Sequence, residues 1–496
     1  MTKPNGALLA LAACALLGCG SNTDAEDAGT GAKYGAGGDG SGAVASGGVS
    51  AQPGSGGAAG APAAGAGASS SGGKSASGGG NTSAGSGGSA AGGTGSGGTS
   101  SSGQGGAVTI EHPPLDCGPV GYAAEDAGPP SNRVNYVIVG DGYTATTVET
   151  TLKQHIEVML KRRFEHESGQ PYARYRKFVN ICVLKAVSDN DGIGNGPTAF
   201  DGGNGGDRLA KVNEKKVSAF LDANLPDTLE PDWRAVVLNQ DKWENTGAHL
   251  MLWSGGNADA AGAALHEGGH GFHQLADEYG GDGSDTKEWS EVNTTADATK
   301  TAGKWDLWLD VVQKGLNVPD LGATGKQSVF EGSRYKDDGQ YRPSDNSMMN
   351  SLFCRPSACG NSKADLATSF NAVSREQIVF SIWRAVKPID AAIPPAGAVV
   401  NPAKLQVAVI DPAVIDVDWS IDGAVVAAKA GGTFDVTAQS LSAGVHEISA
   451  TAYDNASEDL VRYRKGECQA SVQGDYCHAT GWKNSTQTVK WSVTVP

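Results

Sequence analysis

The chain has 496 residues, of which 72 are glycine, and it carries 38 Lys+Arg against 54 Asp+Glu, a formal net charge of −16. This negative balance argues against a nucleic-acid-binding protein, which usually presents a basic patch. Beyond the N-terminus, no apolar run approaches the ~20 residues that a membrane-spanning helix needs. We therefore expect neither a nucleic-acid partner nor a transmembrane helix in the body of the chain.

Residues 1–18 have the pattern of a secretion signal, because Lys3 precedes a short apolar run over residues 7–17. The run ends in Leu-Leu-Gly-Cys, which resembles a bacterial lipobox, so Cys19 is the predicted lipidation site. Cys14 closes a second, shorter pattern of this kind, and an ordinary signal with an incidental cysteine is the competing interpretation. Since Cys19 is followed by no early Asp, we predict an exported outer-membrane lipoprotein, on the cell surface or facing the periplasm.

Residues 19–110 are rich in glycine, serine and alanine. About 32 of the 72 glycines lie between residues 20 and 106, where Tyr34 is the single aromatic residue. Such a segment cannot bury enough apolar surface to offset its ordering entropy. We predict a disordered linker that tethers the remaining residues, which suffice for one large and one small domain.

The large domain, predicted over residues 111–390, mixes strand and helix patterns. Apolar runs predict strands at 135–139, 178–184, 235–238 and 248–253. Helical spacing predicts a helix over residues 147–164, and Asn257 or Asp259 can cap an alanine-rich helix through Leu265. The fold class is therefore α+β. The strand at 248–253 is expected to be an exposed edge that pairs with an extended substrate.

Residues 391–496, which begin with the Pro-rich linker at 394–397, form the predicted small domain. Period-two alternation marks strands at 405–409, 415–421, 445–453 and 489–495, and Asp422-Gly423 lies where a hairpin turn would fall. Short alternating strands at this spacing predict an immunoglobulin-like β-sandwich.

Six cysteines remain once Cys14 and Cys19 are set aside. Proximity suggests the pairs Cys117/Cys182, Cys354/Cys359 and Cys468/Cys477, among 15 arithmetically possible pairings. An even number in an exported chain favours disulfides. No CxxC pair is present, which argues against a cysteine-bound zinc ion.

The sequence LHEGGHGFHQLADEY at residues 265–279 contains an HExxH motif. On a helix, His266 and His270 share one face and can bind one metal ion, while Glu267 can reach a water on that metal. This is the arrangement of zinc peptidases, in which zinc activates water and a carboxylate takes its proton. His273 lies on the same face, but three ligands on one straight helix cannot easily surround an ion, so we expect it to support the ligands from behind or simply to be buried.

The third metal ligand must then come from beyond the helix, if the helix breaks between Gly271 and Leu275. Asp277 and Glu278 are the two candidates. We favour Asp277, seven residues after His270, as the ligand. If the turn after the helix is tight, Glu278 points elsewhere, and we place it behind the ligands.

HExGH followed by LADEY resembles the IgA peptidase family of zinc metallopeptidases (peptidase family sixty-four). Further resemblances follow in order along residues 132–387: GDGYT at 140–144, TAFD at 198–201, VLN at 237–239, FEG at 330–332, Tyr335, GQYRPS at 339–344 and Met349. The resemblance implies a metzincin-like zinc metallopeptidase domain with Zn²⁺ as its cofactor and Met349 in a methionine turn beneath the metal. No tyrosine follows that methionine closely, so we assign oxyanion stabilisation to Tyr341, with Tyr335 as the alternative.

The predicted function is therefore that of a secreted, lipid-anchored zinc endopeptidase acting on extracellular proteins or peptides, with Glu267 as the general base. The alternative is a non-catalytic surface adhesin whose zincin domain is a relic. Retention of His266, Glu267 and His270 together favours the enzyme, because a relic would tolerate the loss of Glu267.

Overall fold

The computed structural model describes residues 108, 110–206, 208–299, 304–311, 327–352, 368–463 and 482–496. The predicted signal, Cys14, Cys19 and the linker up to residue 107 lie outside these ranges, as do Cys354, Cys359, Cys468 and Cys477. Within the described ranges, no helix combines the length and the apolar character that crossing a bilayer would require.

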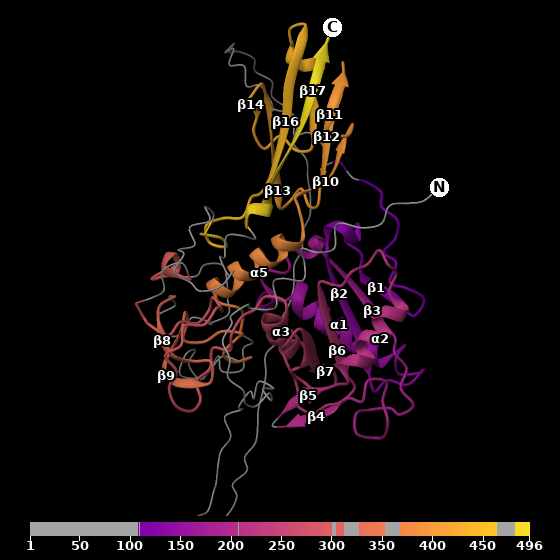
Figure 1. Cartoon of the computed structure of the whole chain (residues 1–496), viewed down its shortest axis with the longest axis vertical. Helices are drawn as coiled ribbons and strands as arrows, with labels where there is room; N and C mark the ends of the chain where they lie inside the picture. The colour runs from indigo at the N-terminus through magenta and orange to yellow at the C-terminus, as the bar shows by residue number, and fades with distance from the viewer. Residues whose placement is uncertain are drawn as a thin grey trace, which may run out of the picture. The chain divides into compact units, whose positions relative to one another are not determined.

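A five-stranded sheet in the order β1-β3-β2-β6-β7 forms the centre of the large domain (Figure 1). Its strands are β1 (Gly121–Glu125), β2 (Val134–Asp141), β3 (Val179–Leu184), β6 (Trp233–Leu238) and β7 (Leu250–Ser254). The last four are parallel to one another, and β1 runs antiparallel to β3. β2, β3 and β7 are buried at every residue, which is why they appear in the sequence as continuous apolar runs. The four predicted strands are confirmed.

Helices cover both faces of this sheet. On one face α1 (Thr151–Phe164) and α3 (Ala260–Gly271) share a hydrophobic core with Tyr136 and Ile138 of β2. On the other face α2 (Glu214–Asn224) packs in a second core with Val137 and Val139. The predicted helix over 147–164 begins later, at Thr151, because the Thr147 hydroxyl accepts a hydrogen bond from the backbone N–H of Thr144 (2.8 Å) in a preceding turn.

The described part of the large domain also contains two hairpins, one more long helix and several 3₁₀ helices. Two hairpins are formed by β4 (Gly203–Gly206) with β5 (Leu209–Lys211), and by β8 (Phe330–Ser333) with β9 (Lys336–Arg342). The long helix α5 (Ala372–Ala385) is buried along most of its length. The 3₁₀ helices here are Pro130–Asn132, Glu167–Gly169, Arg176–Phe178 and Asp306–Trp308.

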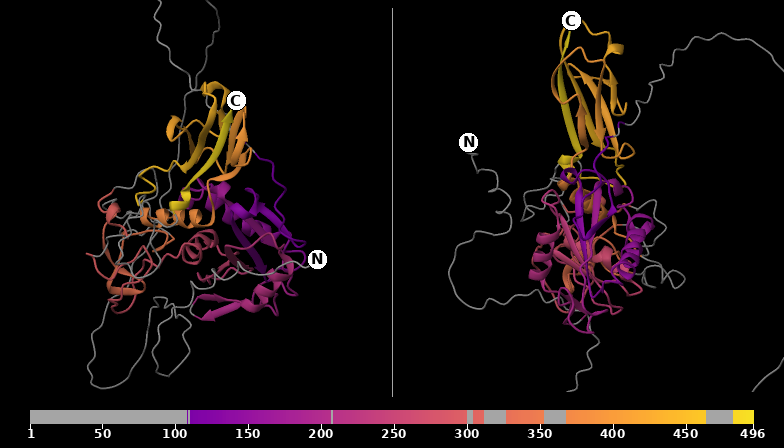
Figure 2. Two further views of the ribbon diagram at one scale, coloured as in Figure 1. Left: turned by 45° about the horizontal axis from the view of Figure 1, so that its top comes forward. Right: turned by 90° about the vertical axis from the view of Figure 1, so that its right-hand side faces the viewer.

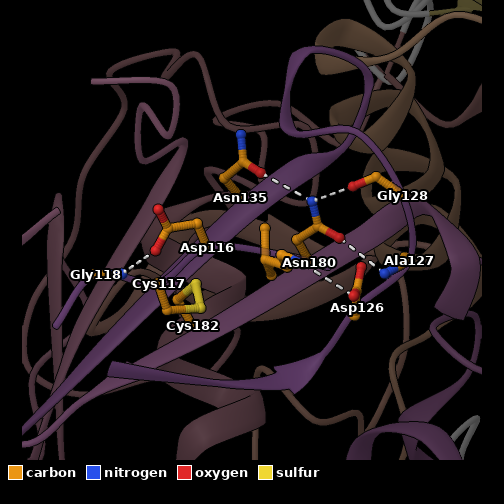
Figure 3. Close-up of a disulfide and its surroundings, with 10 residues drawn as sticks. Asp116, Cys117, Gly118, Asp126, Ala127, Gly128, Asn135, Asn180 and Cys182 are labelled. Atoms are coloured by element: carbon orange, nitrogen blue, oxygen red, sulfur yellow. Dashed lines mark hydrogen bonds between the residues drawn. A yellow bond between two sulfur atoms is a disulfide. The ribbon is translucent and has the colours of Figure 1, made fainter. Parts of the chain in front are cut away.

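One disulfide lies in the described residues and joins Cys117 to Cys182 of β3, with the two Cα atoms 5.5 Å apart (Figure 3). Of the three predicted pairs, this one is confirmed. Beside it, Asn180 accepts a hydrogen bond from Ala127 N (2.9 Å) and donates to the Gly128 carbonyl (3.0 Å). The segments before and after β1 are thereby fixed to β3.

The C-terminal strands, orange to yellow in Figure 1 and Figure 2, form two sheets of their own. One sheet contains β10 (Ile389–Ile393), β12 (Lys404–Val409) and β15 (Thr433–Asp435). The other has the order β11-β17-β16-β13-β14, with bounds Gly397–Val400, Thr486–Val495, Gly444–Asp454, Ile415–Ile421 and Ala424–Ala427. Among the described residues of this part of the chain, Thr437–Gln439 and Lys483–Ser485 form 3₁₀ helices.

The four predicted C-terminal strands are confirmed, and so is the hairpin turn, which follows the second of them and leads into β14. Asp422 (φ 49°) and Gly423 (φ 84°) connect β13 to β14 with the positive φ angles of a tight hairpin turn. Trp419 of β13 stacks on Phe434 of β15 at 5.0 Å between ring centroids, so side chains of the two sheets meet in a common core.

Buried polar contacts join the C-terminal strands to the large domain. Asp454, at the end of β16, accepts hydrogen bonds from Arg174 (2.9 Å), Tyr175 (2.6 Å) and the indole of Trp383 on α5 (2.9 Å). The predicted domain boundary at residue 390 falls inside β10, which pairs with β12. The chain combines a few helices with several distinct sheets, so the α+β fold class is confirmed.

Candidate metal site

The metal-motif helix α3 follows β7 and ends where the chain reverses. Its buried residues, Ala263, Ala264 and Leu265 among them, face the core shared with α1. The helix ends at Gly271, and Gln274 adopts a left-handed conformation (φ 57°). Leu275 N then donates to the Gly269 carbonyl (2.9 Å), so the chain returns past the end of the helix. This break is the condition under which residues after the helix can reach its histidines.

Backbone carbonyls fix the two histidines in one tautomer. Nδ1 of His266 lies 2.8 Å from the Met348 carbonyl oxygen, and Nδ1 of His270 lies 2.7 Å from the Leu275 carbonyl oxygen. Because a carbonyl oxygen can only accept, each Nδ1 carries the ring proton in the neutral histidine. Each Nε2 therefore offers a lone pair, and the two Nε2 atoms face each other at 3.2 Å.

The Asp277 carboxylate completes a triangle of donor atoms. Its Oδ1 lies 3.0 Å from His266 Nε2 and 3.2 Å from His270 Nε2. Three ligands of a tetrahedral ion with bonds of about 2.0–2.1 Å would lie about 3.3 Å apart, so the triangle has suitable dimensions. With both ring protons at Nδ1, the buried Oδ1 has no hydrogen-bond donor among the described residues. When both histidines are neutral, three lone pairs converge here, and this arrangement fits a metal cation.

The charges of this cluster shift its pKa values strongly. Burial lowers the pKa of His270, but the Asp277 carboxylate outweighs it and raises that pKa to about 9. The same competition raises the pKa of His266. Burial raises the pKa of Asp277, whereas the two histidines hold it well below its usual value. These shifts share one cause, because the Asp277 carboxylate favours positive charge beside it, whether a proton on an imidazole or a bound cation.

Glu267 lies beside this triangle and is partly exposed. His266, Glu267 and His270 offer ligand-type atoms that all lie within 4.8 Å of one another. The pKa of the Glu267 carboxyl is raised, because burial raises it more than the two histidines lower it. Gly247 faces this carboxylate: a Cβ there would lie 2.6 Å from Glu267 Oε2 and 2.5 Å from His270 Cδ2. The chain before β7 can pass this close only because residue 247 has no side chain.

The two residues predicted around the ligands lie beneath the site. Glu278 is fully buried, and its carboxylate accepts hydrogen bonds from Asn293 (2.9 Å), Ser347 (2.6 Å) and Asn371 (2.9 and 3.0 Å). The pKa of Glu278 is raised, because burial raises it more than these hydrogen-bond donors lower it. Met349 is also fully buried, and its sulfur would lie 2.5 Å from a Cβ placed on Gly269 of the metal-motif helix. Glu278 N donates to the Met349 carbonyl (2.7 Å), which ties the two segments together.

Tyrosines other than Tyr341 surround Asp277. The Tyr335 hydroxyl donates to Asp277 Oδ2, and the ring of Tyr279 packs edge-on against Tyr335 with centroids 5.0 Å apart. Tyr341 instead interacts with Glu331 on the neighbouring strand, whose charge raises the pKa of its hydroxyl. The structure thus brings Tyr335 to the predicted ligands and not Tyr341. His273 is buried, as expected, and its Nε2 pairs with the Tyr172 hydroxyl (2.7 Å).

The prediction of a free strand edge next to the site is wrong at Leu252. β7 is the last strand of the sheet, but Thr246 forms two backbone hydrogen bonds with Leu252 on its outer side (3.0 and 2.8 Å). The residues before β7 fold back antiparallel to the strand, which the apolar pattern of residues 248–253 could not reveal. An added strand would have to displace them.

Several functional contacts were missed by sequence reasoning. The carbonyls of Met348 and Leu275 that orient the histidines carry no side-chain signal, and Gly247 is one glycine among 72. The Tyr335 contact with Asp277 joins residues 58 positions apart. Only the resemblance of the segment around Tyr335 to a known family could have drawn attention to it.

A His-His-Asp donor set, partly exposed at the two histidines and buried at Asp277, lies beside a glutamate and forms a candidate metal site. The family model described as IgA Peptidase M64 matches residues 123–323, a span that includes β2, β3, β6, β7, α3 and Asp277. This match confirms the predicted resemblance to the IgA peptidase family, and a peptidase family implies protein or peptide substrates. Tyr335, Met349 and the C-terminal sheets lie beyond the matched span. No curated protein matches the chain.

Proposed function

We propose that this chain is an exported, lipid-anchored zinc endopeptidase that hydrolyses peptide bonds of extracellular proteins. The observation that carries the proposal is the convergence of His266 Nε2, His270 Nε2 and Asp277 Oδ1 at 3.0–3.2 Å beside Glu267. Two imidazoles and one carboxylate are a donor set that suits zinc, and catalytic zinc sites use three protein ligands.

His266, His270 and Asp277 would hold the metal in this proposal. When bound, zinc supplies a Lewis acid that lowers the pKa of water and polarises the scissile carbonyl. The carbonyls of Met348 and Leu275 keep both imidazole lone pairs directed inward. The Asp277 negative charge offsets one positive charge of the cation.

Glu267 is the proposed general base. It takes a proton from the attacking water and returns it to the leaving amine, the role that a carboxylate next to such a site can fill. Since Asp277 lies within reach of both Nε2 atoms and Glu267 only flanks them, we assign the third ligand to Asp277.

Met349 and Glu278 are proposed to support the site from below. Met349 fills the space under Gly269, as a methionine turn of the metzincin type would, and Glu278 binds that turn through Ser347. Glu278 is not proposed as a ligand, because Asn293, Ser347 and Asn371 already occupy its carboxylate.

The two C-terminal sheets are proposed to form an immunoglobulin-like β-sandwich. The stacking of Trp419 on Phe434 between the sheets supports this architecture.

The intact donor set and the neighbouring Glu267 favour the enzyme over the alternative of an adhesin with a relic site. A relic site would need neither the donor set nor Glu267.

Export and anchoring are proposed from the N-terminal sequence, with a signal peptide at residues 1–18 and a lipid on Cys19. Radiolabelled palmitate should be incorporated into the wild-type chain and recovered in the outer-membrane fraction. Cys19→Ser should abolish the label. Label that persists in this variant would move the lipidation site to Cys14.

The enzymatic proposal is tested by metal content and proteolysis together, using the full chain. Wild type should hold one zinc ion and cleave an unbiased peptide mixture in a chelator-sensitive manner. Glu267→Ala should keep the zinc and lose cleavage, whereas Asp277→Ala should lose both. Circular dichroism establishes that each variant folds. A folded Asp277→Ala that keeps its zinc while Glu278→Ala loses it would transfer the ligand role to Glu278.

A further inference from the structure

The turn of the β8–β9 hairpin has an unusual backbone. Ser333 pairs with Lys336, so Arg334 and Tyr335 form a two-residue turn, with φ angles of 51° and 63°. Turns with positive φ at both central residues favour Asn and Gly, because other side chains are strained there. A tyrosine in this conformation persists only where its surroundings require it, and such strain concentrates at functional sites.

This turn contacts Asp277 through both its backbone and its side chains. The Ser333 hydroxyl (3.1 Å) and the Arg334 N–H (3.0 Å) both donate to the Asp277 carbonyl. Tyr335 N donates to the Tyr279 carbonyl (3.1 Å), and the Tyr335 hydroxyl donates to Asp277 Oδ2. The hairpin therefore binds both the main chain and the carboxylate of one residue.

Further contacts hold the turn itself in place. The Arg334 guanidinium forms an ion pair with Glu291 and lies over the Trp289 ring at 4.0 Å. The Tyr335 ring packs edge-on against Tyr279. With both central side chains fixed, the turn cannot relax without moving the hydroxyl away from Asp277.

We propose that Tyr335 is a positioning residue that holds the Asp277 carboxylate in its metal-binding orientation. This role rests on the proposed function, in which Asp277 is the third zinc ligand. Because Oδ2 accepts the Tyr335 hydroxyl, Oδ1 alone is left to face His266 and His270. Tyr279 also contacts this carboxylate, but loss of the Tyr335 hydrogen bond leaves Oδ2 less firmly held, and partners of this kind typically contribute 10–100-fold to metal affinity.

The matched control lies in the same hairpin. Tyr341 is on β9, and its hydroxyl interacts with Glu331 instead of Asp277. In the full-length chain, zinc affinity measured by chelator competition should fall about 10–100-fold in Tyr335→Phe. Tyr341→Phe should keep the wild-type affinity. A wild-type chain that holds no zinc would overturn the proposed function and this role with it.

A third variant separates the hydroxyl from the backbone. Tyr335→Gly relieves the positive φ, but it removes the ring that packs on Tyr279 together with the hydroxyl. Its zinc affinity should be as weak as that of Tyr335→Phe. If wild type binds zinc and Tyr335→Phe binds it equally well, the positioning role is wrong. Loss of kcat with unchanged zinc affinity would also overturn it and make Tyr335 a catalytic residue.

Discussion

Replacing Gly269 with alanine tests the packing between the metal-motif helix and the methionine beneath it. An added Cβ would lie 2.5 Å from Met349 Sδ and 3.1 Å from Met349 Cε. Ordinary contacts are about 3.5–4.0 Å, so Met349 must move by about 1 Å. Such overpacking costs about 1–3 kcal/mol, while alanine gains about 1 kcal/mol of helix propensity over glycine. The expected net destabilisation is roughly 0–2 kcal/mol.

Gly262→Ala is the control in the same helix. Its Cβ would lie 3.3 Å from Leu352 Cδ1, a terminal methyl that can shift slightly, so the helix-propensity gain of about 1 kcal/mol should persist. The two variants should differ in melting temperature by about 1–2 °C for each kcal/mol between them, given the unfolding entropy per residue and the size of the folded part. Thermal unfolding in excess chelator measures this difference without metal linkage. A Gly269→Ala chain as stable as Gly262→Ala would refute the close packing of Met349 on the helix.

Three further predictions concern the stability of the fold. Replacing both Cys117 and Cys182 with alanine should cost about 4 kcal/mol in the chain-entropy model for a separation of 65 residues, and a loss below about 1 kcal/mol in urea unfolding would contradict it. Asp454→Ala should cost about 3 kcal/mol, because it leaves the largely buried Arg174 without its counter-charge, and an unchanged urea midpoint would argue against that contact. Burial raises the pKa of Glu376 to about 7, so the folded chain keeps a proton that the unfolded chain has lost, and stability should fall as the pH rises from about 4.5 to 7. Melting temperatures across this range should decline less for Glu376→Gln, and parallel curves would exclude the effect.

Local sequence patterns determined the secondary structure near the site. The apolar runs of β2, β3, β6 and β7 are recognisable because buried parallel strands consist of neighbouring apolar residues. The spacing of His266 and His270 gave the core of the candidate site for a similar reason, since a helix brings residues four apart onto one face. β1, β8 and β9 were not predicted, because their short and partly polar sequences carry no such periodicity.

Tertiary structure decided the parts of the site that depend on distant contacts. The sequence left Asp277 and Glu278 as competing ligands, and the left-handed turn at Gln274 brings the Asp277 carboxylate to the histidines. Tyr341 and Tyr335 lie on the same hairpin, yet only the turn conformation directs Tyr335 toward Asp277. Helix periodicity is set by bonds between near neighbours along the chain. The angle at which a hairpin meets a helix end is set by packing between residues about 60 positions apart, which no local pattern records.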